Sequence, residues 1–385
     1  MCDDSTSSRM MMRAAVYDAF GGKISVRSVP YPKLPSDGGV IIQVMATGVC
    51  RSDWHGWKGH DSDVKDHGLP FVPGHELAGI VVQKATNVVS ISLGDAVAVP
   101  FILSCGHCHE CRERNRPTVC EQQEQPGFTM WGSFAEYVAL PRADRNLRKI
   151  PKGVTFVEAA ALGCRLTTAY RAVIQQGQWN NNNNIRTTNS SIRSIAIFGC
   201  GGLGLSCIMM ATCFTSTNHI IIAIDVSQDA LEKAKQLGAT HVINAKNDDF
   251  VRKQVWKLTQ GRGADLTLDA AGFKATCENA VWCTRRGGRM IQVGLPISGA
   301  NNNNNPIIPM GLVAGREIEI VGSHGFDAKD MPDLLQLVAS KRLNVQNLIE
   351  QQVTLEEGAQ TLMKMDQTSP LGMTMITKFQ GPCRL

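Results

Sequence analysis

Alternating apolar and polar positions dominate the first 150 residues and predict a mainly β region. Residues 13–35 alternate in short runs that proline and glycine interrupt, which is typical of antiparallel strands joined by turns. The next run, Val40 to Ala46, is expected to be a strand that ends just before Cys50. The same pattern predicts further strands at Leu77 to Lys84, Asp95 to Phe101 and residues 133–140.

From Glu158 onward the pattern changes to helical segments that alternate with short apolar runs. Such alternation predicts a parallel sheet built from βαβ units. Two asparagine tracts, 180–184 and 301–305, bury no apolar surface, so we expect them in surface loops without a catalytic role. The strands expected in this half are Ile192 to Phe198, Ile220 to Ile224, Asp265 to Asp269 and Arg289 to Gly294.

Length and composition narrow the class of protein. A chain of 385 residues is long enough for two domains, and 43% hydrophobic with 19% charged residues is typical of a soluble globular protein. A net charge of +5 without a basic run does not favour nucleic acid, and no apolar run is long enough to span a membrane. The thirteen cysteines and the absence of a signal-like N-terminus predict a reducing, cytoplasmic location.

A glycine-rich motif, GCGGLG at 199–204, follows one predicted strand and opens an apolar helix. The next strand ends at Asp225, about 20 residues further on, which completes the fingerprint of a dinucleotide-binding unit. The Asp225 carboxylate can bind the ribose hydroxyls and would repel a 2′-phosphate, so NAD is favoured over NADP. Val293 and Gly294, at the end of a later strand, are expected to face the nicotinamide. The residues of the motif expected to bind the coenzyme are Gly199, Gly201, Gly202, Leu203 and Gly204.

Four cysteines lie close together in the β-rich half and predict a structural zinc site. Four thiolates complete a tetrahedron and leave no open position. A ferredoxin cluster begins with similar spacing but has an earlier fourth cysteine followed by proline, and a zinc finger would need a basic surface. His107 and His109, between these cysteines, are expected to be bystanders. The four cysteines are Cys105, Cys108, Cys111 and Cys120.

Three further residues predict a catalytic zinc site. Cys50, His75 and Cys164 offer two thiolates and one imidazole, and three protein ligands leave the fourth position open for water or substrate. Taken singly, each is more often a small buried residue or a turn residue. The prediction therefore depends on their occurrence together with the cysteine cluster and the nucleotide motif.

Together these motifs resemble the zinc-dependent medium-chain alcohol dehydrogenases, from about Met12 to Phe379. The resemblance implies an α/β fold, in which a GroES-like β-barrel catalytic domain is joined to a Rossmann domain with a doubly wound parallel sheet. The expected divisions are 1–165 with a zinc lobe at about 105–120, then 166–319 as the NAD-binding domain, and 320–385 as a return to the catalytic domain. It further implies a homodimer or homotetramer. The spacer before Cys120 is one residue longer than is usual, which leaves the geometry there in question.

The resemblance also implies roles around the catalytic zinc. Ser52 and His55 would relay a proton to solvent, and Asp53 would accept the free N–H of His75. Other interpretations stay open: helix caps for Ser52 and Asp53, and solvated surface positions for His55 and Arg51. The remaining assignments are Arg51 for the pyrophosphate, Thr168 behind the nicotinamide, Glu76 behind the metal or in a salt bridge, and Phe101, Trp54 and Trp57 as pocket walls.

The resulting prediction is a zinc-dependent oxidoreductase that transfers hydride between NAD and a small primary or secondary alcohol, or its aldehyde or ketone. It would use one catalytic and one structural zinc per chain. Its substrate would be a small molecule, and we expect it to bind neither nucleic acid nor a membrane. Two alternatives are a zinc- and NAD-binding sensor with vestigial catalysis, and a reductase of the zinc-free superfamily branch. The Ser52 and His55 pair counts against the first, and the cysteine ligands count against the second.

Overall fold

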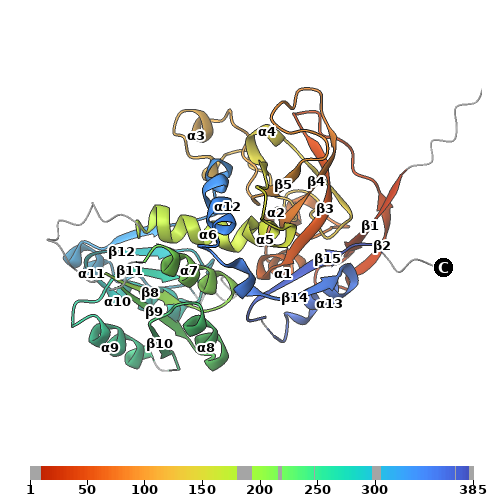
Figure 1. The fold of residues 1–385 in the computed structure, drawn as a ribbon. Helices are drawn as coiled ribbons and strands as arrows, with labels where there is room; N and C mark the ends of the chain where they lie inside the picture. Colours follow the sequence, from red (N-terminus) through yellow and green to blue (C-terminus); the bar gives the residue numbers. More distant parts are fainter. Residues whose placement is uncertain are drawn as a thin grey trace, which may run out of the picture.

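The computed structural model describes residues 10–179, 193–215, 219–246, 248–296, 305–368 and 370–380. The tract at 180–184 and residues 301–304 of the second tract lie outside the described residues. Within the described part, no helix is both long and apolar enough to cross a membrane. The molecule has two halves, a β-rich half drawn mainly in red and orange and a half built on a parallel sheet, drawn mainly in green and cyan (Figure 1).

The β-rich half contains a small hairpin and a seven-stranded sheet. In the hairpin, β1 (Met11–Val16) pairs antiparallel with β2 (Ser25–Pro30), as the alternation predicted. The central strand of the large sheet is β3 (Val40–Val49), which pairs antiparallel with β4, β6 and β15. The other strands are β4 (Glu76–Lys84), β5 (Ala96–Val99), β6 (Tyr137–Leu140), β7 (Arg148–Lys149), β14 (Ile349–Thr354) and β15 (Met373–Lys378).

The end of the chain returns to this half. Strand β15 pairs with β3, and β14 lies parallel to β15, so the last strands complete a sheet begun some 300 residues earlier (Figure 1). The helix between them, α13 (Leu355–Lys364), packs its buried leucines into the core of the β-rich half. Segments far apart in sequence thus share one core.

The other half contains a six-stranded, fully parallel sheet in the order β10-β9-β8-β11-β12-β13. This is the order of a doubly wound dinucleotide-binding sheet, with the crossover point between β8 and β11. In β8, Ile195 and Ile197 belong to one hydrophobic core, whereas Ala196 and Phe198 belong to another, so both faces of the sheet are covered. The strands are β8 (Ser194–Phe198), β9 (Ile220–Asp225), β10 (His241–Asn244), β11 (Ala264–Asp269), β12 (Thr284–Gln292) and β13 (Glu319–Gly322).

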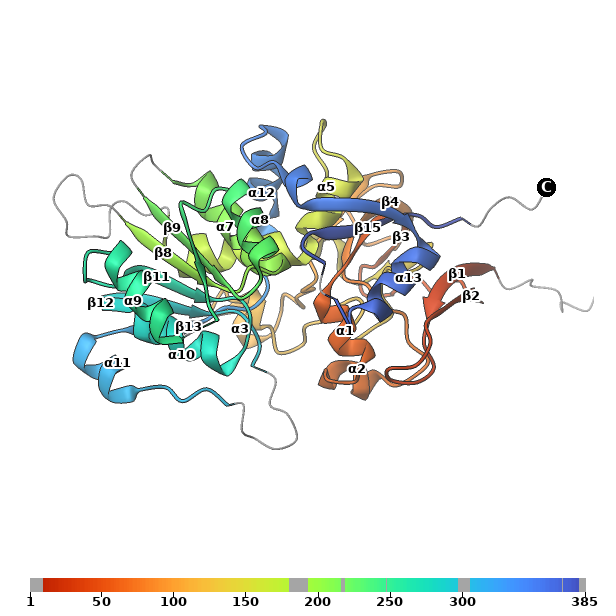
Figure 2. The same cartoon turned by 90° about the horizontal axis from the view of Figure 1, so that it is seen from below.

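Helices cover the two faces of this sheet. Residues of α7 and α8 join the first core, and residues of α9, α10 and α11 pack against the second, with the sheet between them (Figure 2). These helices are α7 (Gly202–Cys213), α8 (Gln228–Gln236), α9 (Asp248–Leu258), α10 (Lys274–Cys283) and α11 (Met310–Arg316).

One unbroken helical run lies between the two halves. It begins at a capping box, where Thr155 Oγ accepts from the backbone N–H of Glu158 at 3.2 Å and the Glu158 carboxylate accepts from the Thr155 N–H at 2.9 Å. Two stretches of the run are π-helical, and such stretches often occur at functional sites. The run comprises α5 (Phe156–Ala161), η2 (Leu162–Leu166), α6 (Thr167–Tyr170) and η3 (Arg171–Gln176).

The predicted fold class is confirmed: a β-rich domain is joined to a doubly wound parallel sheet. The domain division expected between residues 319 and 320 falls inside β13 (Glu319–Gly322), and this strand belongs to the parallel sheet. The remaining short elements are α1 (Arg51–Trp57), α2 (Ser62–His67), α3 (His109–Arg112), η1 (Pro117–Val119), α4 (Ala143–Asn146), η4 (Ala328–Asp330), α12 (Met331–Ala339) and η5 (Val345–Leu348).

Candidate active site and metal centres

Cys50 lies where β3 ends and α1 begins. It is the N-cap residue of α1, and its backbone N–H donates to Asp53 Oδ2 at 3.0 Å, which fixes the first turn of the helix. The cysteine side chain is buried, with 5% of its surface exposed. The turn therefore holds the thiol in place inside the protein.

His75 lies just before β4, and Asp53 orients its ring. Asp53 Oδ1 is 2.7 Å from His75 Nδ1 and accepts the backbone N–H of Gly74 at 3.0 Å. The predicted contact between Asp53 and His75 is therefore present. The other ring nitrogen, His75 Nε2, is buried and has no hydrogen-bond partner among the described residues. A fully buried imidazole with one oriented and one unpaired nitrogen fits a metal ligand.

Cys164 completes the set from the π-helical stretch η2. Ligand atoms of Cys50, His75, Glu76 and Cys164 all lie within 4.8 Å of one another. The pKa of the Cys50 thiol is held well below its usual range, because the Cys164 thiol hydrogen-bonds to it and Arg165 and His75 add positive charge. A thiolate is the form of cysteine that binds metal. The residues present thus fit a zinc ion.

Glu76 begins β4, and Arg165 pairs with its carboxylate. Arg165 Nε donates to Glu76 Oε1 at 2.8 Å, and Nη2 donates to Oε2 at 2.6 Å. Both side chains are buried. The salt-bridge alternative for Glu76 is therefore realised, while the carboxylate still lies beside the other ligand atoms.

Ser52 and His55 follow Cys50 on α1. Ser52 Oγ lies 3.8 Å from Cys50 Sγ, so the hydroxyl is next to the ligand set. His55 Nδ1 lies 3.1 Å from Nδ1 of His60, an exposed residue. Burial, together with the positive charges of Arg51 and His60, lowers the pKa of His55 to about 4, below the near-neutral value that favoured it as a relay. His55 is consequently uncharged at neutral pH.

Aromatic rings surround one side of the ligand set. The Phe101 and Phe128 ring centroids lie 6.0 and 5.0 Å from that of His75, and His324 lies 5.6 Å beyond Phe101. The two tryptophans expected as pocket walls have other partners. Trp57 is buried and donates to the Gly22 carbonyl at 2.7 Å, whereas Trp54 donates to Asp366 Oδ1 at 2.9 Å.

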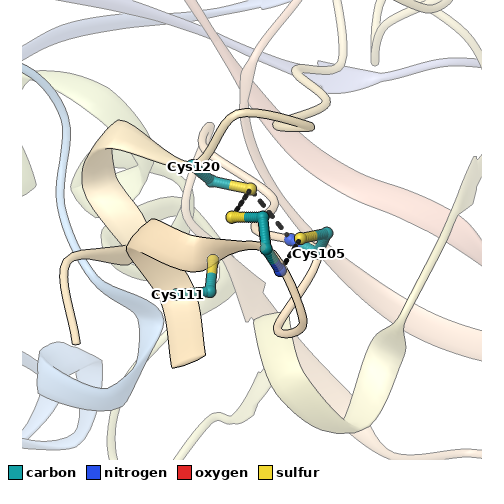
Figure 3. A group of neighbouring side chains, drawn as sticks. Cys105, Cys111 and Cys120 are labelled. Atoms are coloured by element: carbon teal, nitrogen blue, oxygen red, sulfur yellow. Dashed lines mark hydrogen bonds between the residues drawn. The ribbon is translucent and has the colours of Figure 1, made fainter. Parts of the chain in front are cut away.

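The second metal set lies in the lobe between β5 and β6. The sulfur atoms of its four cysteines are within 4.8 Å of one another, and all four thiols are free and buried (Figure 3). The longer spacer does not displace the last ligand, because the short helix η1 ends at Val119 and turns Cys120 back, so that its sulfur accepts the Cys105 N–H at 3.3 Å. His107 and His109 are exposed and outside the set, as predicted. Four buried thiols without a disulfide fit a structural zinc.

The glycine motif joins β8 to α7. Gly199 has φ +91°, in the left-handed region that favours glycine, and a Cβ on Gly204 would lie 1.7 Å from the Gly199 carbonyl oxygen. A Cβ on Gly201 would have no atom of the described residues within 4 Å, so the backbone faces open space there. Gly201 caps α7, whose N-terminal N–H groups attract phosphate. The loop thus fits a dinucleotide pyrophosphate.

The other residues assigned to the coenzyme lie around this loop. Asp225, at the end of β9, accepts the backbone N–H of Cys200 at 2.6 Å and of Ser227 at 2.8 Å, which places its carboxylate beside the motif. Gly294, after β12, donates to the Asp269 carbonyl at 2.8 Å, next to Val293. Thr168 is buried in α6. Arg51 instead stacks over Trp54, with 3.7 Å between its guanidinium carbon and the ring centroid, so its pyrophosphate role stays a prediction.

Comparison with known proteins agrees with this geometry. Residues 36–152 match the alcohol dehydrogenase GroES-like domain, and residues 202–340 match the family described as zinc-binding dehydrogenase. An alcohol dehydrogenase of Geobacillus stearothermophilus is 33% identical over 346 residues, covering 89% of this chain and 92% of that relative. An NAD-dependent alcohol dehydrogenase of Sulfurisphaera tokodaii is 30% identical over 371 residues, covering 95% and 99%. The structure of an alcohol dehydrogenase from Thermus sp. ATN1 superposes with a TM-score of 0.82 at 29% identity, covering 95% and 99%.

A nucleotide-binding parallel sheet beside a β-rich domain with two thiol-containing metal sets defines a metal-dependent oxidoreductase. The chain belongs to the zinc-dependent medium-chain dehydrogenase family. Its cofactors are zinc, at a catalytic and a structural site, and NAD.

Three residues near the site could not be assigned to it from the sequence. Arg165 follows Cys164 directly, and a basic residue next to a buried ligand could have been paired with the acidic residue that follows His75. His60 lies five residues after His55, which no simple helical spacing links to it. Phe128, in the loop before β6, carries no sequence signal for its contact with His75.

Proposed function

We propose that this chain is an NAD-dependent alcohol dehydrogenase that acts on small primary or secondary alcohols and their aldehyde or ketone partners. The observation that carries the proposal is the buried Nε2 of His75, which has no hydrogen-bond partner among the described residues and lies beside the thiols of Cys50 and Cys164. Cys164 belongs to the helical run that also packs against the coenzyme half. A zinc ion bound there supplies Lewis-acid polarisation of a substrate oxygen, and NAD supplies the hydride acceptor.

The protein's own residues would position and deprotonate the substrate. Ser52 Oγ, 3.8 Å from Cys50 Sγ, is close enough to the ligand set to accept a proton from a substrate hydroxyl. His55 lies further along α1, and its position on that helix supports a role in passing the proton toward solvent, although its pKa of about 4 makes it a weak proton acceptor at neutral pH. The rings of Phe101 and Phe128 would exclude water from this side of the site, which favours hydride transfer over side reactions.

The test is to record NADH formation at neutral pH with short, branched, polyol and aromatic alcohols, with NADP in parallel and with Cys164→Ala as the matched variant. We expect a rate with NAD on one subset, loss of that rate in Cys164→Ala, and unchanged NAD binding in that variant. A rate that survives in Cys164→Ala or after chelation would contradict zinc catalysis. Silence of the zinc-loaded protein across the whole panel would favour a sensor.

We further propose that the chain self-associates as a dimer or tetramer and works in the cytoplasm. Strand β13 lies at the edge of the parallel sheet with Ile320 exposed, and an unpaired apolar edge is suited to pairing with another strand. The eleven cysteines of the described chain are all free, which fits a reducing compartment. We also propose that the chain divides into a catalytic domain, a coenzyme domain and a C-terminal return to the catalytic domain. The two large sheets support this division, because β14 and β15 join the sheet of β3.

A further inference from the structure

Glu76 offers the catalytic metal set a fourth ligand. Its carboxylate lies within 4.8 Å of the ligand atoms of Cys50, His75 and Cys164. Carboxylate oxygen is a common zinc ligand, and a fourth protein ligand would close the tetrahedron and leave no position for a substrate. If this carboxylate bound the metal, a substrate would have to displace it, so a contact that draws the carboxylate aside would keep the fourth position available.

Arg165 engages both oxygens of that carboxylate. Besides the two bonds at 2.8 and 2.6 Å, the Arg165 backbone N–H donates to Glu76 Oε1 at 3.3 Å. A guanidinium that binds both oxygens of a carboxylate fixes its plane as well as its position. Nη2 also donates to the Val49 carbonyl at 3.0 Å, which anchors the arginine to the end of β3, next to Cys50.

The coenzyme loop lies close to the Arg165 side chain. A Cβ built on Gly202, the first residue of α7, would lie 2.8 Å from Arg165 Cδ and 3.0 Å from Nη1. At the neighbouring Gly201, no atom in the described part of the chain lies within 4 Å of the Cβ position. Of these two glycines, Gly202 therefore makes room for the arginine, whereas Gly201 makes room for a ligand.

We propose that Arg165 is a positioning residue that holds the Glu76 carboxylate off the catalytic zinc and so keeps the fourth coordination position open. The inference rests on the proposed function, since it concerns the metal that this function requires. It adds a link between the two halves, because the same side chain contacts the metal-site carboxylate and the coenzyme loop.

The test uses cobalt at the catalytic set, with zinc kept in the cysteine cluster, and free imidazole as a probe of the open position. In the wild type, imidazole should bind the cobalt and shift its visible absorption bands. In Arg165→Met, Glu76 is released onto the metal, so the bands should change before any probe is added and the imidazole affinity should fall at least about tenfold. Arg165→Met with Glu76→Gln should regain the imidazole response, because a neutral amide is a weaker ligand and no unpaired buried charge remains.

A second pair of variants leaves Arg165 in place. Gly202→Ala crowds the arginine and should weaken the imidazole response in the absence of coenzyme. Gly201→Ala, where the added methyl group meets open space, should leave the coenzyme-free cobalt spectrum unchanged. This pair separates displacement of Arg165 from any general effect of a methyl group in the loop.

An Arg165→Met protein that folds, as judged by circular dichroism, and binds imidazole like the wild type would overturn the inference. So would equal spectra for Gly202→Ala and Gly201→Ala. A wild-type protein that takes up no cobalt at Cys50, His75 and Cys164 would instead refute the proposed function itself, and the two failures are therefore distinguishable.

Discussion

At the scale of single residues, Asp53 organises the metal ligands from behind. Its two carboxylate oxygens accept from the backbone of Cys50 and Gly74 and contact the ring of His75, so one buried side chain fixes both ligand-bearing segments. The sequence predicted the histidine contact, and the two backbone contacts emerge from the structure. A residue outside the ligand set therefore fixes the two segments that carry Cys50 and His75.

Replacing Asp53 by asparagine tests this control. An amide has one acceptor oxygen in place of two, so at least one of the three donors loses its partner. We expect the affinity of the catalytic set for zinc to fall about 10–100-fold, as measured by competition with a chromogenic chelator. Asp66→Asn, on the exposed side of α2, should retain wild-type zinc affinity. Equal chelator profiles for both variants would contradict the assigned role.

His55 should leave a signature in the pH dependence of stability. Its pKa is lowered from 6.5 to about 4 by burial and by the charges of Arg51 and His60, while Cys50 acts in the opposite direction. Between these pH values the unfolded chain binds a proton that the folded chain does not, so stability should rise as pH increases from about 4 to about 6.5.

The measurement is the free energy of denaturant unfolding at several pH values, for the wild type and for His55→Gln. The difference between the two proteins isolates this histidine, because acid loss of zinc affects both alike. We expect the wild type to gain stability relative to the variant as pH rises through this window. A difference that stays constant with pH would show that His55 titrates normally in the folded protein.

At the scale of elements, the cysteine lobe shows how a short helix adjusts a metal site. Helix η1 ends at Val119, directly before Cys120, and Cys120 joins the other three thiols although the spacer is longer than expected. Nearby backbone N–H groups donate to its sulfur, those of Cys105 and Gln122 both at 3.3 Å. These donors stabilise a thiolate and orient it toward the cluster.

Cys120→Ser should cost the protein one of its two metal equivalents and lower its melting temperature, because a neutral hydroxyl is a poor zinc ligand and the structural metal contributes to folding. Elemental analysis of the purified protein would measure the loss. Cys213→Ser, at the half-buried end of α7, is the matched control and should keep both equivalents. Full zinc content in Cys120→Ser would mean that three thiols hold the metal.

Spacing and periodicity predicted the elements and ligand sets well, and they failed where a contact depends on packing between distant segments. The four cysteines of the lobe can be recognised from their local spacing. The glycine motif can be recognised from the strand before it and the helix after it. The pairing of Arg165 with Glu76 joins residues 89 positions apart and exists because β4 and η2 pack together. Likewise, the alternation could not show that Trp57 points into the core and bonds to Gly22, since tryptophan suits a pocket wall equally well.

At the scale of the whole molecule, β13 is the feature most open to another copy of the chain. It pairs with β12 on one side and forms an edge of the sheet on the other. Ile320 on this strand is 40% exposed. Ile320→Lys would place a charge at that edge, and edge charges oppose strand pairing.

We expect the molar mass of the wild type, measured by light scattering, to be that of a dimer or tetramer. At the same concentration, Ile320→Lys should dissociate into smaller species. Val89→Lys serves as a control, because Val89 is 84% exposed in the other half of the molecule. Its mass should match that of the wild type. Dissociation of both variants, or of neither, would place the subunit interface elsewhere.

The helical run between the halves limits how this chain could be recombined with its relatives. It carries Cys164 and Arg165, whose partners Cys50, His75 and Glu76 all belong to the β-rich half, yet it continues into α6 beneath the coenzyme sheet. A chimera joined at Thr155 would take Cys164 and Arg165 from one parent and their partners Cys50, His75 and Glu76 from the other. A junction after Gly177 would keep all of these residues from one parent. The practical boundary for domain exchange therefore lies at the end of the helical run, although the coenzyme half already packs against that run.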